Sequence, residues 1–413
     1  MQTSLIESLK DTAQGREAEA ILRSCVHCGF CTATCPTYQV LGDELDSPRG
    51  RIYLIKQMLE GNAVSGKTQL HLDRCLHCLA CETTCPSGVR YGRLVDIGRE
   101  MVDLHVPRPW SARMLRRVLR RVLPFPRRFA LLVGLGRRFQ AFLSPGLRHK
   151  LPLPQTAPVW PEPRHVRKML VLEGCVQSVA TPATNAAAAR VLDRLGISLI
   201  RADGAGCCGA LSHHLSARHE ALQFMRRNID AWWPHVESGV EAIVMTASGC
   251  GAVVKEYGML LRDDPVYAKK AARIASMTQD LSEILAEEDL QALAVDAQEK
   301  KVAFQAPCTL QHGQRITGLV EGILSRCGFR LTPVADAHLC CGSAGTYSIL
   351  QPELSKQLLT AKVKSLQAGG PALIATANIG CQLHIQTQAS VPVRHWVELL
   401  DSLPVAGAGS ANA

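Results

Sequence analysis

The chain contains two cysteine runs of identical spacing, Cys25-Val-His-Cys28-Gly-Phe-Cys31-Thr-Ala-Thr-Cys35-Pro36 and Cys75-Leu-His-Cys78-Leu-Ala-Cys81-Glu-Thr-Thr-Cys85-Pro86. The spacing C-x2-C-x2-C-x3-C-P is typical of domains that hold two [4Fe–4S] clusters. It is less typical of a disulfide framework or of zinc sites, which usually take two CxxC pairs or mixed sets of cysteine and histidine. The two runs therefore predict an electron-transfer domain with two clusters.

The expected ligand sets follow from the way such runs work in pairs. The first three cysteines of a run hold one cluster, and the fourth holds the cluster of the other run. We assign one cluster to Cys25, Cys28, Cys31 and Cys85. We assign its partner to Cys75, Cys78, Cys81 and Cys35. Between the runs, Ser47 and Pro48 predict the start of a helix, so we expect an α-helical ferredoxin domain over residues 1–104.

Composition places the chain among globular metal-binding proteins. Its 413 residues are enough for two or three domains, and 47% of them are hydrophobic. The first residues lack the basic start and apolar run of a signal peptide, and no stretch approaches the ~18 apolar residues of a spanning helix. Seventeen cysteines without an export signal favour metal ligation over disulfides, because the cytosol keeps thiols reduced. We expect a cytoplasmic protein.

Two glycine-rich stretches match nucleotide-binding patterns, but their contexts do not fit. Gly61-Asn-Ala-Val-Ser-Gly-Lys-Thr68 has the letters of a P-loop, yet a helix rather than a strand is expected before it. Gly204-Ala-Gly-Cys-Cys-Gly209 has the letters of a dinucleotide fingerprint, but the acidic residue expected about 20 positions later is not evident. We predict no nucleotide, NAD or FAD site on this chain.

A strongly basic segment, residues 105–165, follows the ferredoxin domain. The stretch Leu104–Pro161 contains no acidic residue and twelve Lys or Arg. Residues 114–123 have the pattern of an amphipathic helix, and residues 151–163 that of a stiff Pro-rich linker. Three interpretations stay open: contact with a membrane surface or a partner, a helical linker whose apolar face packs on its own domain, and, with less support, nucleic-acid binding.

The remaining sequence contains one module twice, at residues 166–290 and 300–404. Apolar strands alternate with helices in both copies, which predicts parallel βαβ sheets. Cys175 and Cys308, the first cysteines of the two copies, are 133 residues apart, and the Cys-Cys-Gly motifs keep this period. The expected fold class is α+β and multidomain: a helical two-cluster ferredoxin domain, then a duplicated α/β cysteine-rich domain, and a flexible tail at residues 405–413.

The cysteines of each module fall just after expected strands. The carboxyl ends of parallel strands meet at one edge of a sheet, where ligands usually bind. Four cysteines should meet there in each copy: Cys175, Cys207, Cys208 and Cys250 in the first, and Cys308, Cys340, Cys341 and Cys381 in the second. A further iron–sulfur cluster and zinc are the candidate occupants, and inert buried thiols are the alternative. We interpret His384 as a surface residue rather than an additional ligand, and Cys327 as part of the core.

Taken together, the two runs and the two modules with Cys-Cys-Gly resemble the iron–sulfur subunits of glycolate oxidase. The resemblance covers essentially the whole chain. It is sharpest at Asn228–Pro234, Thr246–Ala252, Pro307–His312, His338–Tyr347 and Thr376–Cys381. The modules of that family often end in C-x2-C, whereas this chain has Val253 and His384 at the final position. More distant similarity extends to subunits of anaerobic glycerol-3-phosphate dehydrogenase, lactate-oxidising complexes and heterodisulfide reductase.

The resemblance implies a subunit of a glycolate dehydrogenase complex that oxidises glycolate to glyoxylate. It implies that FAD lies on partner subunits, that this chain has no catalytic residue and is inactive on the substrate alone, and that electrons pass through its clusters to an acceptor such as a membrane quinone. It also implies a hetero-oligomer, peripheral at the cytoplasmic face of the inner membrane and without nucleic acid. Two alternatives stay open: a subunit of a D-lactate or glycerol-3-phosphate dehydrogenase complex, and a disulfide reductase whose Cys-Cys-Gly modules are catalytic.

Overall fold

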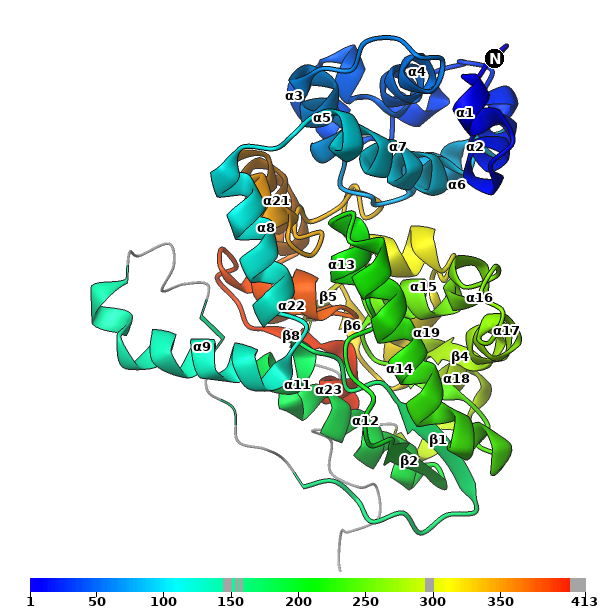
Figure 1. Cartoon of the computed structure of the whole chain (residues 1–413). Helices are drawn as coiled ribbons and strands as arrows, with labels where there is room; N and C mark the ends of the chain where they lie inside the picture. Colours follow the sequence, from blue (N-terminus) through cyan, green and yellow to red (C-terminus); the bar gives the residue numbers. More distant parts are fainter. Residues whose placement is uncertain (144–150, 153–154, 156–158, 294–300, 402–413) are drawn as a thin grey trace, which may run out of the picture.

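The computed structural model describes residues 1–143, 151–152, 155, 159–293 and 301–401. Figure 1 shows a helical domain at the N-terminus, a helical arm beside it, and two modules with sheets at the other end of the molecule. The expected α+β architecture, with a helical region followed by two parallel four-stranded sheets, is confirmed. The tail expected at residues 405–413 lies outside the described residues.

The N-terminal domain consists of helices and turns in the part of the chain described here. Its helices are α1 (Glu7–Lys10), α2 (Ala13–Ser24), α3 (Pro36–Leu41), α4 (Pro48–Leu59), α5 (Gly66–Asp73), α6 (Ala80–Thr84) and α7 (Tyr91–His105), with 3-10 turns at Phe30–Thr32 and Glu44–Asp46. Helix α4 begins as expected: the Ser47 side chain accepts a hydrogen bond from the Gly50 amide, and Pro48 occupies the first turn. The apolar faces of α2, α4, α5 and α7 form the core.

The P-loop-like stretch connects two helices. Helix α4 ends at Leu59 and α5 begins at Gly66, so no strand precedes the glycines, as expected. Helix α5 itself was not expected. It has only eight residues and buries only three of them, so its apolar pattern is too weak to predict a helix.

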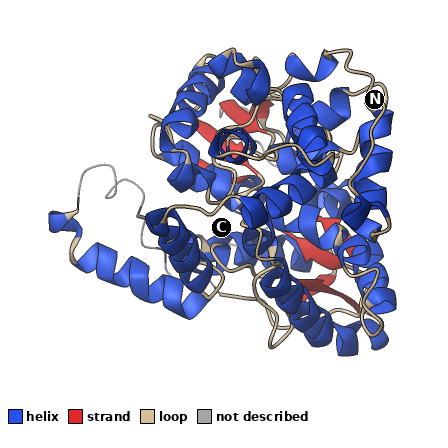
Figure 2. Ribbon diagram, turned by 45° about the horizontal axis from the view of Figure 1, so that its top comes forward, coloured by secondary structure: helices blue, strands red, loops and turns tan. Residues whose placement is uncertain are grey.

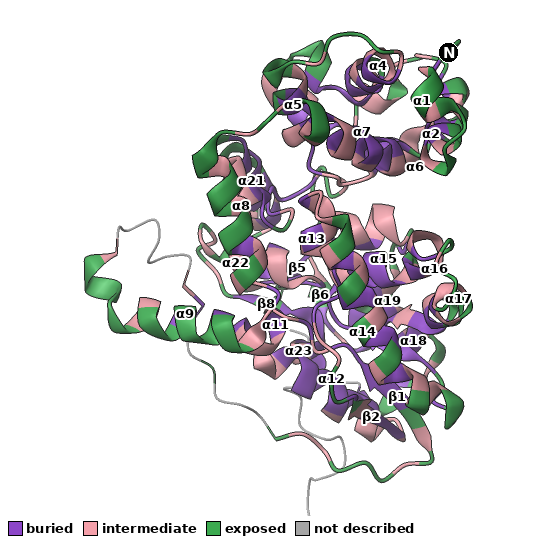
Figure 3. Ribbon diagram, in the orientation of Figure 1, coloured by how far each residue is buried: buried purple, intermediate pink, exposed green. Residues whose placement is uncertain are grey.

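The helical arm comprises α8 (Trp110–Val122), α9 (Pro126–Arg138) and a 3-10 turn at Gln140–Phe142. The amphipathic helix of the arm is α8, and it does not pack its apolar face against the protein, as expected of a simple linker. Arg116 and Arg120 point toward the protein and form ion pairs of 3.2 and 3.6 Å with Asp73 and Glu220. In contrast, Met114, Leu115, Val118 and several apolar residues of α9 are exposed, as Figure 3 shows along both helices. The arm is held instead by a few buried residues, mainly Leu119, Phe129 and Val133.

The first module contains a parallel sheet in the order β2-β1-β3-β4. Its strands are β1 (Arg167–Val171), β2 (Ile197–Arg201), β3 (Ile243–Met245) and β4 (Thr278–Asp280). Its helices are α11 (Gln177–Ala180), α12 (Pro182–Arg194), α13 (Ala210–His214), α14 (Arg218–Glu237), α15 (Ser248–Lys255), α16 (Tyr257–Leu260), α17 (Ala268–Met277) and α18 (Leu281–Glu287), followed by a 3-10 turn at Leu290–Leu293. The register places Met169 opposite Leu199. The chain reverses its direction of winding between β1 and β3, which is where ligands bind in such sheets.

The second module repeats this topology in the order β6-β5-β7-β8. Its strands are β5 (Lys301–Gln305), β6 (Arg330–Leu331), β7 (Leu373–Thr376) and β8 (Val393–His395). A π-helical turn at Thr309–Gly313 precedes α19 (Leu319–Arg326), α20 (Tyr347–Leu350), α21 (Pro352–Gln367), α22 (Ile379–Gln386) and α23 (Trp396–Asp401). Strands β4, β6 and β8 were not expected, because they have only two or three residues, too few to form a periodic pattern.

The two modules share one hydrophobic core, and Figure 2 shows their sheets enclosed by helices. Helix α12 packs against α23, and α18 packs against α19. Cys327 is completely buried in this core, as expected. At the buried junction, the His395 ring lies 2.8 Å from the Thr246 carbonyl oxygen of the other module. None of the helices described in the structure is both long and apolar enough to cross a membrane.

Candidate metal centres

The first cysteine run and the last cysteine of the second run line one cavity of about 420 Å³. Cys25, Cys28, Cys31 and Cys85, the set expected for one cluster, all form part of its wall, together with Cys81. Cys28 is exposed, and the neighbouring Phe30 side chain is 62% exposed, so this cavity lies close to the surface.

The second cavity, of about 300 Å³, is lined by the other expected set: Cys35, Cys75, Cys78 and Cys81. The fourth cysteine of each run thus lies at the cavity of the opposite run. Proline follows each of these crossing residues, and Pro36 begins α3, with Cys35 as the N-cap. The structure therefore brings each expected set together.

Both runs use the same unusual backbone. His27 and His77 have φ of 56° and 53°, and Gly29 and Leu79 have φ of 86° and 62°. Left-handed backbone is uncommon for residues other than glycine, and strain of this kind is characteristic of ligand-binding loops. The turns direct successive cysteines of one run toward a common centre.

A buried cationic network lies against the second cavity. The Arg51 guanidinium is 3.9 Å from the Cys35 sulfur and forms a 3.1 Å ion pair with Asp46, which is itself completely buried. The Tyr91 hydroxyl donates a hydrogen bond to the Cys75 sulfur. Burial raises the pKa of the Cys75 thiol. The guanidinium groups of Arg51 and Arg99 and the hydrogen bond from Tyr91 outweigh this effect, so the pKa lies below its usual value. Such surroundings suit a thiolate ligand.

The first cavity has a weaker cationic environment. Burial raises the pKa of the Cys31 thiol to about 11. The nearest guanidinium, on Arg49, is committed to an ion pair with Glu44, and both side chains are partly exposed. The two cavities are therefore electrostatically distinct, although the runs that form them are nearly identical.

The four expected cysteines of the first module also meet, at the carboxyl edge of its sheet. Cys175 follows β1, Cys207 and Cys208 follow β2, and Cys250 lies in α15 after β3. Their thiols contact one another in the order in which they occur in the chain. Hydrogen bonds from Cys175 and Cys208 hold the pKa of Cys207 well below its usual value, and the Gly209 amide also donates to the Cys207 sulfur.

The second module repeats this arrangement. The sulfurs of Cys308 and Cys340 are 3.8 Å apart, and Cys341 links Cys340 to Cys381. The glycine of each Cys-Cys-Gly motif is required by space: at Gly342, with φ of 85°, a Cβ would come within 2.7 Å of the Ser355 carbonyl oxygen. This turn points the Gly342 amide at the Cys340 sulfur, at 3.4 Å.

His384 is not the surface residue that was expected. It is half-buried, and its Nε2 lies 3.0 Å from the Ser355 hydroxyl, which donates a hydrogen bond to the Gly342 carbonyl oxygen. The histidine therefore helps to hold the Cys-Cys-Gly turn in place through the Ser355 hydroxyl. Its helical position one turn after Cys381 indicated proximity to the site, but not this intermediate partner.

The second cavity lies beside the cysteines of the second module. Leu76, Cys340 and Tyr347 belong to one buried cluster, against which Cys78 and Cys308 pack. Burial and the adjacent Cys308 raise the pKa of the Cys78 thiol well above its usual value. The Tyr347 hydroxyl donates to the Arg74 carbonyl oxygen at 3.0 Å and joins the two domains directly. Nothing in the sequence predicted this juxtaposition, because it depends on how the domains pack.

The donor sets fit iron–sulfur clusters, since an expected set of four cysteines lines each of two cavities in a helical domain. The fold and these sites define an iron–sulfur electron-transfer protein. Residues 21–89 match the family described as 4Fe-4S dicluster domain, and residues 169–255 and 302–386 each match the cysteine-rich domain.

The chain belongs to the family of glycolate oxidase iron–sulfur subunits. It is 56% identical to the glycolate oxidase iron-sulfur subunit of Escherichia coli (strain K12) over 403 residues, which cover 97% of this chain and 98% of that protein. It is 29% identical to the probable glycolate oxidase iron-sulfur subunit of Bacillus subtilis (strain 168) over 92% of both chains. Lactate utilization protein A of the same organism is 27% identical over 57% of this chain and 99% of its own length.

Proposed function

We propose that this chain carries electrons within a complex that oxidises glycolate to glyoxylate. The family membership supports the complex, and the contact between the second cavity and the cysteines of the second module carries the electron-transfer proposal. Cys78 and Cys308 pack in one cluster, so successive redox sites would be close neighbours. No residue of this chain acts on the substrate.

In this proposal, Cys25, Cys28, Cys31 and Cys85 hold one [4Fe–4S] cluster, and Cys75, Cys78, Cys81 and Cys35 hold the other. Such clusters, when bound, accept and release one electron at a time. The protein sets their potentials through burial, hydrogen bonds to sulfur and nearby charge. Here Arg51 and the Tyr91 hydroxyl favour added negative charge at the second cavity.

The flavin belongs to partner subunits in this proposal. Oxidation of glycolate removes a hydride and a proton, and an FAD on a partner subunit would supply the two-electron chemistry for it. In this chain the Gly204–Gly209 loop supplies cysteines to the module site instead of cradling a phosphate. The quinone of a membrane is the proposed acceptor. The module cysteines would hold a further iron–sulfur cluster or zinc.

The purified chain alone is expected to leave glycolate unchanged, whereas co-expression with the FAD-containing subunits should give glycolate-dependent reduction of a dye.

Anaerobic iron, sulfide and zinc analysis measures the cofactors. About eight irons per chain would leave the modules without clusters, and more would fill them. If the complex oxidised D-lactate or glycerol 3-phosphate faster than glycolate, the proposed substrate would be wrong. Reduction of a mixed disulfide by the chain alone would instead favour a catalytic role for the modules.

The arm offers a surface for contact with an anionic membrane at the cytoplasmic side. Its outward apolar side chains include Trp110 at 68%, Leu131 at 66% and Phe142 at 87% exposure. Exposed arginines lie among them: Arg113, Arg117, Arg121, Arg127, Arg128 and Arg138. Apolar side chains beside a basic stripe are the pattern of helices that lie in a membrane interface.

The double substitution Leu131→Gln and Leu132→Gln should weaken binding of the complex to vesicles of phosphatidylglycerol and phosphatidylethanolamine. Each leucine contributes roughly 1.5–3 kcal/mol when fully buried in an apolar phase, so a loss of at least about 100-fold is expected in a sedimentation assay. Val266→Gln is the matched control, because Val266 is 67% exposed on the first module. Unchanged vesicle binding, with loss of co-purifying subunits, would assign the arm to a protein partner.

A further inference from the structure

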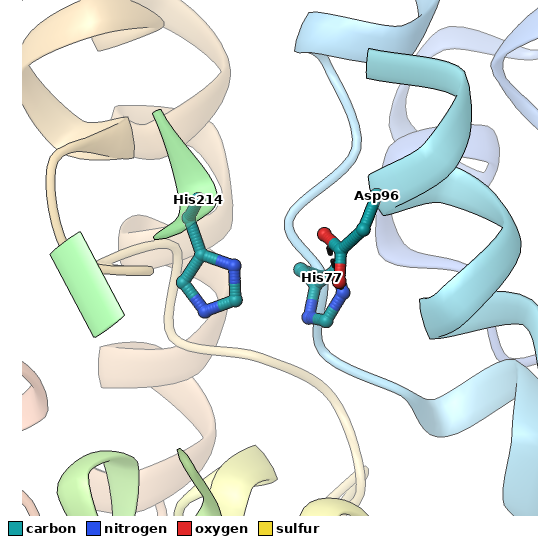
Figure 4. Close-up of side chains that lie close together, drawn as sticks. All are labelled: His77, Asp96 and His214. Atoms are coloured by element: carbon teal, nitrogen blue, oxygen red, sulfur yellow. Dashed lines mark ion pairs between the residues drawn. The ribbon is translucent and has the colours of Figure 1, made fainter. Parts of the chain in front are cut away.

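Two histidines and an aspartate meet where the ferredoxin domain contacts the first module. His77 lies in the second cysteine run, Asp96 in α7, and His214 at the end of α13. One ligand atom from each of these residues lies within 4.8 Å of the other two. Figure 4 shows the imidazole of His214 facing His77 and Asp96 across the domain boundary. The ring centres of His77 and His214 are 4.7 Å apart.

The Asp96 carboxylate is held in place by two histidines, one at each of its oxygens. His77 Nε2 is 3.3 Å from one carboxylate oxygen, and His213 Nε2 is 3.2 Å from the other. Among the described residues, no lysine or arginine forms an ion pair with it. Metal-bound carboxylates typically have such an outer hydrogen bond, and His213 supplies it here.

The His214 side chain has an unused donor atom. Its Nδ1 is buried, and no described residue forms a hydrogen bond with it. A buried nitrogen without a partner loses its hydration without compensation, so such atoms call for an explanation such as an ion or a water molecule. His214 belongs to the same three-residue cluster as His77 and Asp96. A buried nitrogen without a hydrogen-bond partner therefore lies in a cluster that also contains a carboxylate.

A second group with similar composition, Asp43, Asp46 and His71, serves as a contrast. Asp46 is already paired with two guanidinium groups, those of Arg51 at 3.1 Å and Arg74 at 2.8 Å. These cations occupy the place that a metal ion would take. In the first group the partners of Asp96 are His77 and His213. Unlike a guanidinium, an imidazolium can lose its proton to make room for a metal ion.

We propose that His77, Asp96 and His214 bind one Zn²⁺ ion or a similar divalent first-row transition metal ion. Two imidazole nitrogens and one carboxylate oxygen are a common protein donor set for zinc, which leaves a fourth position for water. A cavity next to the site includes Asp96 and His213 in its wall.

The metal would fasten the second cysteine run to the first module. His77 stands between Cys75 and Cys78, while His214 comes from α13, so coordination joins two domains through a single ion. This role is separate from the proposed transfer of electrons and does not depend on it. The donor set also differs from the cysteine sites, since it contains no thiol.

Metal analysis of the purified chain, reconstituted anaerobically and loaded with Zn²⁺, tests the site. His214→Ala is expected to bind one zinc per chain less than wild type, with iron and sulfide unchanged. Asp96→Asn should give the same loss while keeping the shape of the side chain. His219→Ala is the matched control: His219 lies five residues later, is exposed, and should leave the zinc content unchanged.

Replacement of zinc by Co²⁺ gives a readout that does not depend on stoichiometry. A site of nitrogen and oxygen donors produces weak visible d–d bands, whereas a cysteine site adds intense thiolate-to-metal charge transfer in the near ultraviolet. We expect His214→Ala to remove d–d absorption and to leave any charge-transfer band in place. Equal zinc content and identical cobalt spectra in His214→Ala, Asp96→Asn and wild type would overturn the proposal, and the cluster would then be a hydrogen-bonded contact between domains.

Discussion

Substitution of Cys35 by alanine is expected to abolish the second cluster, even though Cys35 belongs to the first cysteine run. Its sulfur lies in the wall of the second cavity with Cys75, Cys78 and Cys81, and the first cavity keeps its four cysteines. The variant should therefore lose about four of about eight irons in the ferredoxin domain. Glycolate-dependent dye reduction by the complex should fall at least about 100-fold if electrons must pass this position.

Spectra of the reduced proteins identify which cluster is lost. The EPR spectrum of Cys35→Ala should match that of Cys78→Ala, and Cys85→Ala should match Cys28→Ala. The opposite pairing, with Cys35→Ala resembling Cys28→Ala, would show that each run holds its own cluster. Cys327→Ala is the control, because this cysteine is buried in the module core and away from every proposed site.

Replacement of Arg51 by methionine should lower the reduction potential of the second cluster by roughly 100 mV. A unit charge at roughly 6 Å contributes about 3 kcal/mol at an effective dielectric constant of about 20, and about 1.4 kcal/mol corresponds to about 59 mV for one electron. Arg51 is buried, and its guanidinium lies 3.9 Å from the Cys35 sulfur. EPR-monitored redox titration measures the shift.

The same substitution should destabilise the folded protein by about 3–5 kcal/mol, since removal of one partner leaves the buried Asp46 carboxylate less well compensated. Arg49→Met is the matched control. Arg49 is two residues away but partly exposed and paired with Glu44, so its loss should cost under about 1 kcal/mol and leave the second cluster unshifted. A potential that responds equally to both substitutions would mean that burial of the guanidinium is unimportant.

The features predicted best from sequence were those set by local spacing. The cysteine runs, the helix start at Ser47 and the 133-residue period all concern residues that act through fixed positions along the chain. The crossing of Cys35 and Cys85 was also predicted, because the alternation of ligands is a property of paired runs.

The features that were missed depend on packing between distant segments. The arm has an amphipathic pattern, but the pattern alone does not say which side faces the protein, and Asp73 and Glu220 draw Arg116 and Arg120 inward. His77 and His214 are 137 positions apart, so no motif connects them. Likewise, His384 acts on the Cys-Cys-Gly turn through Ser355, whose position follows only from the packing of α21 against α22.

The contacts between the modules have a consequence for ancestry. Helix α12 meets α23 while its counterpart α19 meets α18, so each half of the interface repeats the other, as in a twofold symmetric dimer. After β3 and β7, the Ser248 amide donates to the Ala377 carbonyl oxygen across the junction. This is the geometry expected of a homodimer whose subunits became joined by gene fusion. Once joined, the two modules were free to diverge. The second module now adjoins Cys78 of the ferredoxin domain, and the first adjoins His77.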